Sequence, residues 1–493
     1  MRGRLLSAIV ATALAALAGC GSKSSGPLNV AVIGEARDIF AGGQPLTEGA
    51  QVIAGATGAG LVALDAKGEI EPALADRWIV TDDGTSYIFR LREGSWPDGA
   101  ELTGESARVA LRQALRGVQG TSLGLDLAPI AEVRAMAGRV VDIDLKAPMP
   151  DFLRLLAQPE LALSRRARPA GPMVLQKHTG KGRSFTELTF KPPETRGLPQ
   201  DGNWQKHVRP VAIEALGAKA ALAAFASGKV DVVLGGTVAS WPLADPGPLS
   251  LGNVRLDNTV GLFGLQVMRE RGFLASAPSR EAVAMAIDRA ALLSPFNIGG
   301  WVPNNRIVPP EIAAVKAPDR WAGMSIDQRR ALAAERVSAW RVSAGKGKQP
   351  VLTIALDTEP GDAMLFDGLA SQLALVGITL QRVEPGQPGD LALIDRVARY
   401  GESRWFLNQF NCSLARGLCD SQADALVEAA AGTPDAAERA ADLGKAEALL
   451  TAANVYIPIA APLRWSMVRG NVTGYAANPW AWHPLPDMAV IPK

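Results

Sequence analysis

Alternating hydrophobic and polar positions between Gly60 and Leu115 predict a run of short strands and turns that leads into a helix. Apolar runs at Trp78-Ile-Val80 and Tyr87–Leu91 flank an Asp-Gly turn at Asp83-Gly84, and this pattern is typical of a β-hairpin. Pro72-Ala-Leu-Ala75 is expected to open a short helical turn that ends at Trp78. These residues are turn formers and core apolar groups, so the stretch specifies a scaffold and not a catalyst.

A helix is expected directly after this hairpin. Thr103 is a residue type that favours the N-cap position, and Glu105 falls in the first turn. One face of the helix is then apolar, at Ala107, Ala110, Leu111 and Ala114.

The segment from Val211 to Leu234 has the pattern of a strand, a helix and a second strand. The helix is followed by Gly228 as a stop signal, and its apolar positions are Ala218, Ala221, Leu222 and Phe225. Such a unit implies a right-handed crossover and a parallel pair. Ligands on parallel sheets lie beyond the carboxyl ends of the strands. Gly235, Gly236 and Thr237 are therefore candidate ligand contacts with Trp241 near them, although Gly-Gly also fits a simple turn.

A second unit of the same kind begins at Val351. A strand there precedes a helix whose inward positions are Leu365, Leu369 and Leu373, and Ile378-Thr-Leu380 forms the second strand. Two such units far apart in the chain favour two α/β lobes. The other expected elements are strands at 28–34, 140–145 and 456–460, and helices at 148–156, 279–291 and 422–453, with a loop over 174–204.

The N-terminus has the pattern of an export signal. Met1–Arg4 is charged, Leu5–Ala16 is apolar but short for a membrane span, and Leu17-Ala-Gly-Cys20 matches a lipobox. We expect Cys20 to be lipidated and Gly21–Pro27 to be a polar tether. The alternative is an ordinary secretory signal in which Cys20 is incidental.

Two further cysteines, Cys412 and Cys419, would then lie outside the cytoplasm, where disulfides persist. We expect them to form a disulfide. A site with two cysteine ligands for a metal, which lacks a nearby His, and two free thiols are the alternatives.

Composition narrows the class of function. The 493 residues carry a formal net charge of +2 with 20% charged residues, which leaves no basic stripe for nucleic acid. We find no nucleophile elbow, phosphate-binding loop or zinc-protease motif, and His178, His207 and His483 stand alone. The sequence therefore predicts no enzyme, no metal and no cofactor.

One run of residues forms a family signature: Gly60-Leu61, Asp65, Gly68, Pro72–Ala75, Trp78, Asp83-Gly84, Tyr87, Phe89, Leu91-Arg92, Gly94, Asp98-Gly99 and Leu102-Thr103. Further matches are the Ala286-Ile-Asp-Arg289 helix end and Gly474-Tyr475 with Asn478-Pro479. In these residues the chain resembles family 5 of the bacterial extracellular solute-binding proteins, which are receptors of ABC importers. The resemblance implies an α/β, periplasmic-binding-protein-like fold with two lobes, a hinge and an extra inserted domain.

The same resemblance suggests domain ranges. They are 1–19 for the signal, 20–27 for the tether, 28–50 with 166–260 and 465–493 for domain I, 51–165 for the inserted domain II, and 261–464 for domain III.

It also suggests ligand contacts. The first strand ends at the ligand cleft in this family, which makes Glu35 and Arg37 candidates, although both also fit solvated loop charges. Arg399 aligns with an Asp that holds the peptide amine in relatives, so a carboxylate or phosphate is expected near it, unless Glu402 binds an amine instead. Other candidates in this segment are Tyr400, Trp405 and Asn411.

The expected function is a lipid-anchored receptor, periplasmic or on the cell envelope, that closes on a peptide or anionic solute and delivers it to ABC permease subunits. We expect a monomer that contacts the membrane only through its lipid and binds no nucleic acid. An accessory lipoprotein without a transport ligand and a periplasmic hydrolase are the alternatives.

Overall fold

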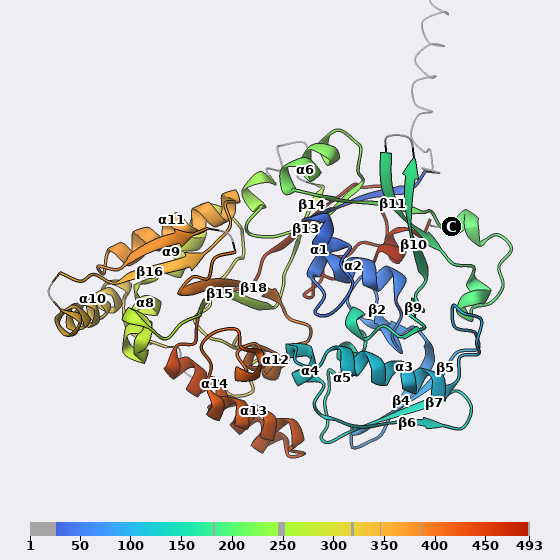
Figure 1. Ribbon diagram of the computed structural model, residues 1–493, viewed down its shortest axis with the longest axis horizontal. Helices are drawn as coiled ribbons and strands as arrows, with labels where there is room; N and C mark the ends of the chain where they lie inside the picture. The colour runs from blue at the N-terminus through green and yellow to red at the C-terminus, as the bar shows by residue number, and fades with distance from the viewer. Residues whose placement is uncertain are drawn as a thin grey trace, which may run out of the picture.

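The computed structural model describes residues 26–180, 183–244, 252–316, 320–345, 347–384 and 386–491. Three principal sheets organise these residues, and helices pack around them (Figure 1). The structure does not describe residues 1–25, which include the lipobox cysteine Cys20 and most of its tether. No described helix has both the length and the apolar character that a membrane span requires.

The seven-stranded sheet has β1 (Leu28–Ile33) near its centre, in the order β10-β11-β12-β1-β13-β20-β14. β1 is parallel to β12 (Val211–Leu216) on one side and to β13 (Val232–Gly236) on the other. The predicted strand–helix–strand unit is present, with α6 (Ala218–Ala226) between its strands. Its two strands are not direct neighbours, however, because the N-terminal strand lies between them.

An antiparallel hairpin extends one edge of this sheet. β10 (Met173–Gly180) pairs with β11 (Arg183–Phe190), and β11 pairs with β12. The expected loop over 174–204 is therefore wrong in its first half. The mixed polar and apolar residues of this edge hairpin obscure the alternation by which a half-buried strand is recognised.

The four-stranded sheet contains the predicted hairpin. β4 (Ala75–Val80) pairs with β5 (Ser86–Leu91) and places Trp78 opposite Phe89, and β7 (Val140–Leu145) and β6 (Ile130–Met136) complete the sheet. The helical turn expected from Pro72 to Trp78 is wrong, because Pro72 ends β3 (Ile70–Pro72), which pairs with β2 (Val62–Leu64), and Ala75 already begins β4. α3 (Gly104–Gly117) begins as predicted, with Thr103 and Ser106 in a capping box.

The five-stranded sheet has the order β17-β16-β18-β15-β19 and carries the second predicted unit. β16 (Val351–Ala355) and β17 (Thr379–Val383) are parallel and are joined by α11 (Pro360–Ala374). The sheet is completed by β18 (Leu391–Val397), β15 (Gly261–Val267) and β19 (Tyr456–Ala460). α10 (Ile326–Ala344) lies with the helices around this sheet (Figure 1).

Two predicted helices are each divided in two. The segment 279–291 forms α8 (Ala277–Ala286), capped by Ser276, and α9 (Arg289–Leu293), capped by Asp288. The long C-terminal helical segment forms α13 (Ser421–Gly432) and α14 (Ala436–Ala453). In each case an Asp that accepts backbone N–H bonds at a helix start, Asp288 or Asp435, marks the new N-terminus.

Two short crossovers connect the seven-stranded and five-stranded sheets. β14 (Val254–Asp257) leads through 258–260 into β15, and β19 leads through 461–463 into β20 (Arg464–Val468). Thr259 donates its hydroxyl hydrogen to the carbonyl of Pro462, which ties the crossovers together. These paired segments form the hinge region between the two lobes. The predicted domain ranges remain a proposal, although the three sheets fall within them except for Arg464 at the start of β20.

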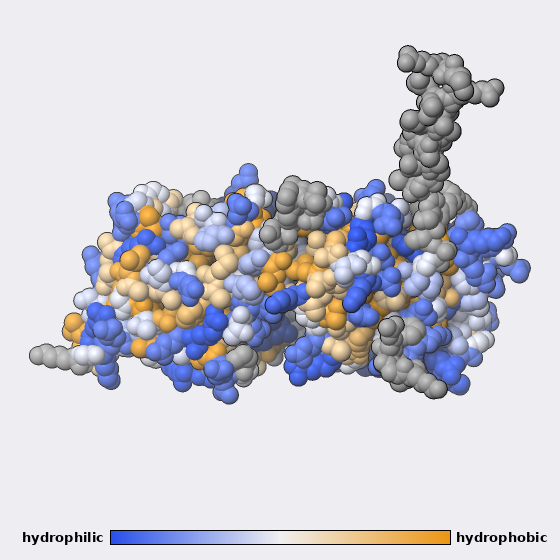
Figure 2. Space-filling model, turned by 90° about the horizontal axis from the view of Figure 1, so that it is seen from above, coloured by the Kyte–Doolittle hydropathy of each residue, from blue (hydrophilic) through white to orange (hydrophobic). Residues whose placement is uncertain are grey.

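Figure 2 shows apolar residues on the upper face gathered in several patches that polar residues separate. This face therefore presents no single broad apolar surface among the described residues.

Candidate functional site

A cleft of about 600 Å³ lies beside the hinge, between the seven-stranded and five-stranded sheets. The carboxyl ends of the parallel strands β1 and β13 open into it through Ile33, Gly235, Gly236 and Thr237. This position agrees with the general placement of ligands on parallel sheets. The opposite wall comes from the end of β18, at residues 396–399, and from the loop that contains Arg416.

Arg464 at the start of β20 joins the two walls by ion pairs. Its guanidinium donates to both carboxylate oxygens of Glu48, at 2.8 and 2.7 Å, and to Oδ1 of Asp395 at 2.6 Å. Glu48 is the first residue of α2 (Glu48–Thr57), whereas Asp395 belongs to β18 in the other sheet. Burial lowers the pKa of Arg464, but the two carboxylates outweigh this effect, so the guanidinium stays charged.

The remaining carboxylate of the cleft also has partners. Asp257 accepts a hydrogen bond from the backbone N–H of Asn478 at 3.0 Å, and its other oxygen lies 3.0 Å from Nε2 of His483. Glu48 and Asp257 are therefore both engaged, and neither offers a free charge to a solute.

Two arginines of the cleft have no such partner. Among the described residues, Arg396 and Arg416 form no ion pair, and Arg396 donates to Oε1 of Gln409 at 3.2 Å. Burial lowers the pKa of Arg396 to about 10, and the charges of Arg416 and Arg399 add to the effect. Burial also lowers the pKa of Arg416. Two cations in one partly dry cleft are therefore available for an anion, which guanidinium groups bind bidentately.

Tryptophan rings supply much of the apolar lining. Trp405, Trp465, Trp480 and Trp482 all line the cleft. Trp465 donates its indole N–H to the carbonyl of Thr237 at 3.0 Å and packs against the backbone of Gly236, where a Cβ would lie 2.2 Å from the ring. Gly236 is thus required by this close approach. Aromatic walls with a few placed charges are typical of small-molecule sites.

A disulfide closes the loop that carries Arg416. Cys412 is bonded to Cys419, and the loop is fixed at its ends because Leu418 donates to the carbonyl of Val267 at 2.7 Å and Cys412 donates to Asp424 at 2.9 Å. The disulfide therefore limits the positions that Arg416 can occupy beside the cleft.

Comparison with known proteins identifies this architecture. The model of the family described as bacterial extracellular solute-binding proteins, family 5 Middle, matches residues 69–411, which is more than half of the chain. The chain belongs to this family. Its fold is the two-lobed α/β fold of family 5, as the sequence predicts.

Solved structures support the same fold along nearly the whole chain. The structure of Haemophilus influenzae OppA in complex with RPPGFSPFR is similar with a TM-score of 0.77 at 18% identity, and covers 94% of this chain and 99% of that one. The structure of the Escherichia coli murein tripeptide binding protein MppA gives 0.78 at 20% identity, covering 95% and 99%. The unliganded open form of MppA gives 0.60 at 20% identity, covering 94% and 96%.

Curated relatives match over a shorter stretch. The probable deoxycholate-binding periplasmic protein YgiS of Escherichia coli (strain K12) is 32% identical over 145 residues, which is 24% of this chain and 24% of that protein. The glutathione-binding protein GsiB of the same strain is 29% identical over 136 residues, which is 27% of this chain and 25% of that protein. The match thus spans about a quarter of the length of these relatives.

Arg399, the predicted anion contact, lies at the cleft but is already neutralised. It donates to both carboxylate oxygens of Glu160, at 2.9 and 2.6 Å, and to Oε1 of Gln158 at 3.0 Å. The side chain of Glu160 is only 1% exposed. This ion pair joins the domain III segment to the 3₁₀ turn Pro159–Leu161 of the opposite lobe.

Tyr400 and Glu402 belong to the same contact between lobes and do not line the cleft. Tyr400 is fully buried and donates to Asp126 at 3.0 Å, and Asn408 donates to the same oxygen at 2.7 Å. Asp126 ends α4 (Ser122–Asp126), and burial raises its pKa to about 7. Glu402 precedes α12 (Ser403–Asn408), where burial and then Asp151 raise its pKa.

The other predicted contacts divide in the same way. Gly235, Gly236, Thr237 and Trp405 line the cleft. Glu35 and Arg37 pair with each other at 2.8 Å on the exposed surface, and the structure places neither in the cleft lining. Trp241 donates to the carbonyl of Phe296, and Asn411 caps the 3₁₀ turn Cys412–Leu414, so both have structural contacts outside the cleft lining.

The sequence prediction missed Arg396 and Arg416. Arg396 follows strand residues with no distinguishing motif, so only the tertiary arrangement shows that it lacks a carboxylate partner. Arg416 had a usable signal, because it lies between the two cysteines. Among the described residues, no group of three or more His, Cys, Asp or Glu is placed to hold a metal ion.

Replacement of Arg399 by Ala should destabilise the protein and not abolish anion binding. The change leaves the buried carboxylate of Glu160 without its cation, which typically costs about 3–5 kcal/mol of unfolding free energy. Urea unfolding of the Arg399→Ala and Arg416→Gln variants measures this cost, and Arg416→Gln should change stability little because no ion pair is broken. Equal stability of Arg399→Ala and the unmodified protein would contradict the assignment.

Proposed function

We propose that the protein is an extracytoplasmic receptor that closes its two lobes on a small anionic solute and delivers it to an ABC importer. The observation that carries this proposal is the pair of arginines, Arg396 and Arg416, that face the cleft without carboxylate partners. The cleft lining contains four arginines and only two carboxylates, Glu48 and Asp257, so the charge of the lining is positive. An anionic group of the solute supplies the balance.

The ligands named for the relatives are consistent with this charge. Deoxycholate and glutathione, which appear in the names of two relatives, both carry a carboxylate. The ring of tryptophans fits the apolar part of such a solute, because aromatic faces bury apolar surface with little loss of side-chain entropy. We propose the class of anionic solutes with an apolar body, and not one particular compound.

Closure of the lobes is the proposed mechanism. The contacts of Arg399 with Glu160 and of Tyr400 with Asp126 connect the lobes and favour a closed arrangement here. A solute anion between Arg396 and Arg416 would relieve the repulsion between the two guanidinium groups. Because the anion gives both arginines a partner, its binding favours the closed form.

An accessory protein that has lost its ligand is a weaker alternative. Two partly buried, unpaired guanidinium groups cost stability, and such a cost is usually retained where a charge is needed for binding.

The double variant Arg396→Gln/Arg416→Gln should lose affinity for anionic solutes. Each charge-assisted hydrogen bond contributes about 1.5–3 kcal/mol, so the dissociation constant should rise about a hundredfold. Calorimetry with deoxycholate and glutathione measures it. The matched control is Arg37→Gln, an exposed arginine outside the cleft lining.

Unchanged binding by the double variant would refute the anionic ligand class. Equal binding of an uncharged amide derivative of the same solute would refute it as well.

Loss of the disulfide should weaken binding because the loop around Arg416 becomes free. Ordering one residue costs about 1–2 kcal/mol, so the Cys412→Ser/Cys419→Ser variant should bind the same anion about tenfold less tightly. The far-ultraviolet circular dichroism spectrum serves as a control and should stay unchanged. If affinity is retained, the disulfide has no part in placing Arg416.

Lipid attachment at Cys20 is part of the proposal and rests on the apolar run that ends in the lipobox. The variant Cys20→Ser should appear in the soluble fraction after cell fractionation, whereas the unmodified chain should sediment with membranes. Membrane association of Cys20→Ser would mean that another element holds the protein there.

A further inference from the structure

A second cavity, of about 890 Å³, lies between the edge hairpin β10–β11 of the seven-stranded sheet and the small ladder β2–β3. We call it the interdomain cavity. Its apolar surface includes Trp96, Phe190 and Trp482. Trp482 also lines the cleft, together with Leu64 and Gln158, so these residues separate two adjoining spaces.

Three cations line this cavity without a carboxylate partner. Among the described residues, Arg92, Lys191 and Arg196 form no ion pair. Arg92 donates to the carbonyl of Arg196 at 3.2 Å, and Lys191 donates to the carbonyl of Pro169 at 3.2 Å. The guanidinium of Arg196 lies 6.0 Å from the ring centre of Phe190. Neutral carbonyls and a ring therefore take the place of counter-ions.

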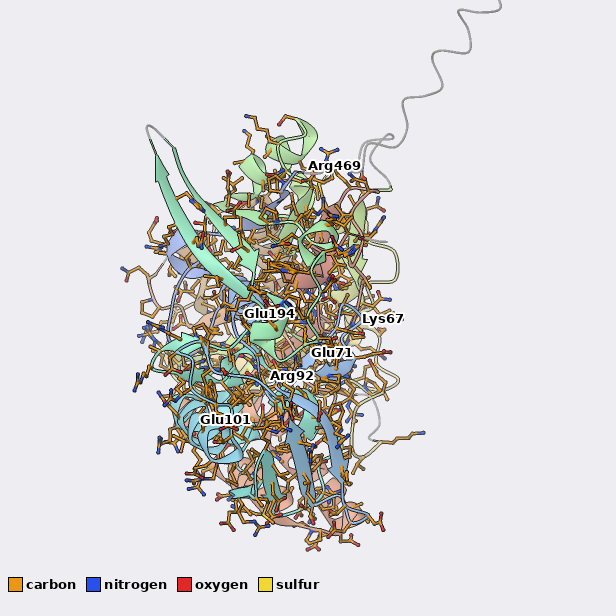
Figure 3. The ribbon with its side chains drawn as sticks, turned by 90° about the vertical axis from the view of Figure 1, so that its right-hand side faces the viewer. Lys67, Glu71, Arg92, Glu101, Glu194 and Arg469 are labelled. Atoms are coloured by element: carbon orange, nitrogen blue, oxygen red, sulfur yellow. A yellow bond between two sulfur atoms is a disulfide. The ribbon has the colours of Figure 1, made fainter. Side chains whose placement is uncertain are left out.

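Three carboxylates line the same cavity, Glu71, Glu194 and Asp487, also without an ion pair among the described residues. Asp487 accepts the backbone N–H of Ala66 at 3.1 Å, and Glu71 is exposed at the rim. Figure 3 shows Glu71 and Arg92 near the middle of this face, with Glu194 beside them at the exposed rim. The cavity thus holds opposite charges that have not combined with one another.

Contacts set the order of these charges along the cavity. Arg92 donates to the carbonyl of Arg196, and Lys191 belongs to the same segment as Arg196, so the three cations lie together. Glu71 of β3 pairs with Ala63 of β2, and Asp487 accepts the backbone N–H of Ala66 just after β2, so these two carboxylates lie together. Burial lowers the pKa of Lys191 and of Arg196 and raises the pKa of Glu71. The cations therefore gather at one end, with the exposed Glu194 at the rim, and Glu71 with Asp487 lies at the other.

We propose that the interdomain cavity is a second binding site for a small zwitterion, with its anionic group toward Arg92, Lys191 and Arg196 and its ammonium group toward Glu71 and Asp487. A simple anion would satisfy only one end of the cavity and a simple cation only the other. A molecule that carries both charges satisfies both ends, and the aromatic walls bury the chain between them. This site does not depend on the solute proposed for the cleft.

Three compounds with the same carbon chain and different charges test the proposal. They are δ-aminovalerate, a zwitterion; glutarate, a dianion; and cadaverine, a dication. Fluorine NMR of protein labelled with fluorotryptophan separates the two sites, because Trp96 lines only the interdomain cavity and Trp405 lines only the cleft. The variants Trp96→Phe and Trp405→Phe assign the two signals.

The Trp96 signal should shift saturably with δ-aminovalerate, at least tenfold more weakly with glutarate, and most weakly with cadaverine. In Arg92→Gln/Arg196→Gln the affinity should fall about tenfold or more, while the melting temperature stays equal or rises because unpaired cations have been removed. The matched control is Arg77→Gln/Arg90→Gln, which replaces two exposed arginines that face each other on β4 and β5.

A Trp96 signal that does not respond to δ-aminovalerate overturns the proposal, and so does equal binding by Arg92→Gln/Arg196→Gln. Glutarate binding as tightly as δ-aminovalerate overturns the zwitterionic class. A fall in melting temperature with unchanged affinity would show that the arginines are structural. The Trp405 signal reports separately on anion binding in the cleft, so failure of one site is distinguishable from failure of the other.

Discussion

The ion pairs of Arg464 are the interaction on which the arrangement of the cleft depends. Arg464 follows directly after the crossover 461–463 and binds a carboxylate from each side, Glu48 of α2 and Asp395 of β18. Because one guanidinium is shared between two carboxylates, both acids are held at the base of the cleft. Arg396, next to Asp395 in the chain, then has no acid left to pair with. The unpaired charge of Arg396 is therefore a consequence of the ion pairs that Arg464 forms with Glu48 and Asp395.

The segment from Arg399 to Asn408 illustrates how burial decides the role of a charge. A guanidinium near the cleft suggests a ligand contact, but Arg399 faces Glu160, whose carboxylate could not remain buried without it. Tyr400 and Asn408 similarly donate to one oxygen of the buried Asp126. These residues join the lobes, and we propose that other residues of the cleft contact the solute. A family alignment places the segment correctly at the cleft but does not show which side chains are already occupied.

Local signals in the sequence were sufficient for much of the fold. The Asp83-Gly84 hairpin and the Thr103 cap depend on residues near in sequence, and both were predicted. The insertion of β1 between β12 and β13 depends on pairing of residues 28–33 with strands that begin only after residue 210, so no local pattern contains it. The candidate arginines were missed for a related reason. Arg396 lacks an acid because the distant Arg464 engages both Asp395, its neighbour in the chain, and Glu48.

Gln158 connects these features physically. It lines both the cleft and the interdomain cavity, and its side-chain oxygen accepts a hydrogen bond from Arg399 at 3.0 Å. The contact of Arg399 with Glu160 and Gln158 therefore also fixes a residue in the wall between the two cavities. Trp482 is held in that wall by donation to the carbonyl of Leu64 at 3.0 Å. Any energetic effect that one ligand exerts on the other through this wall must be reciprocal, because linkage applies equally to both binding events.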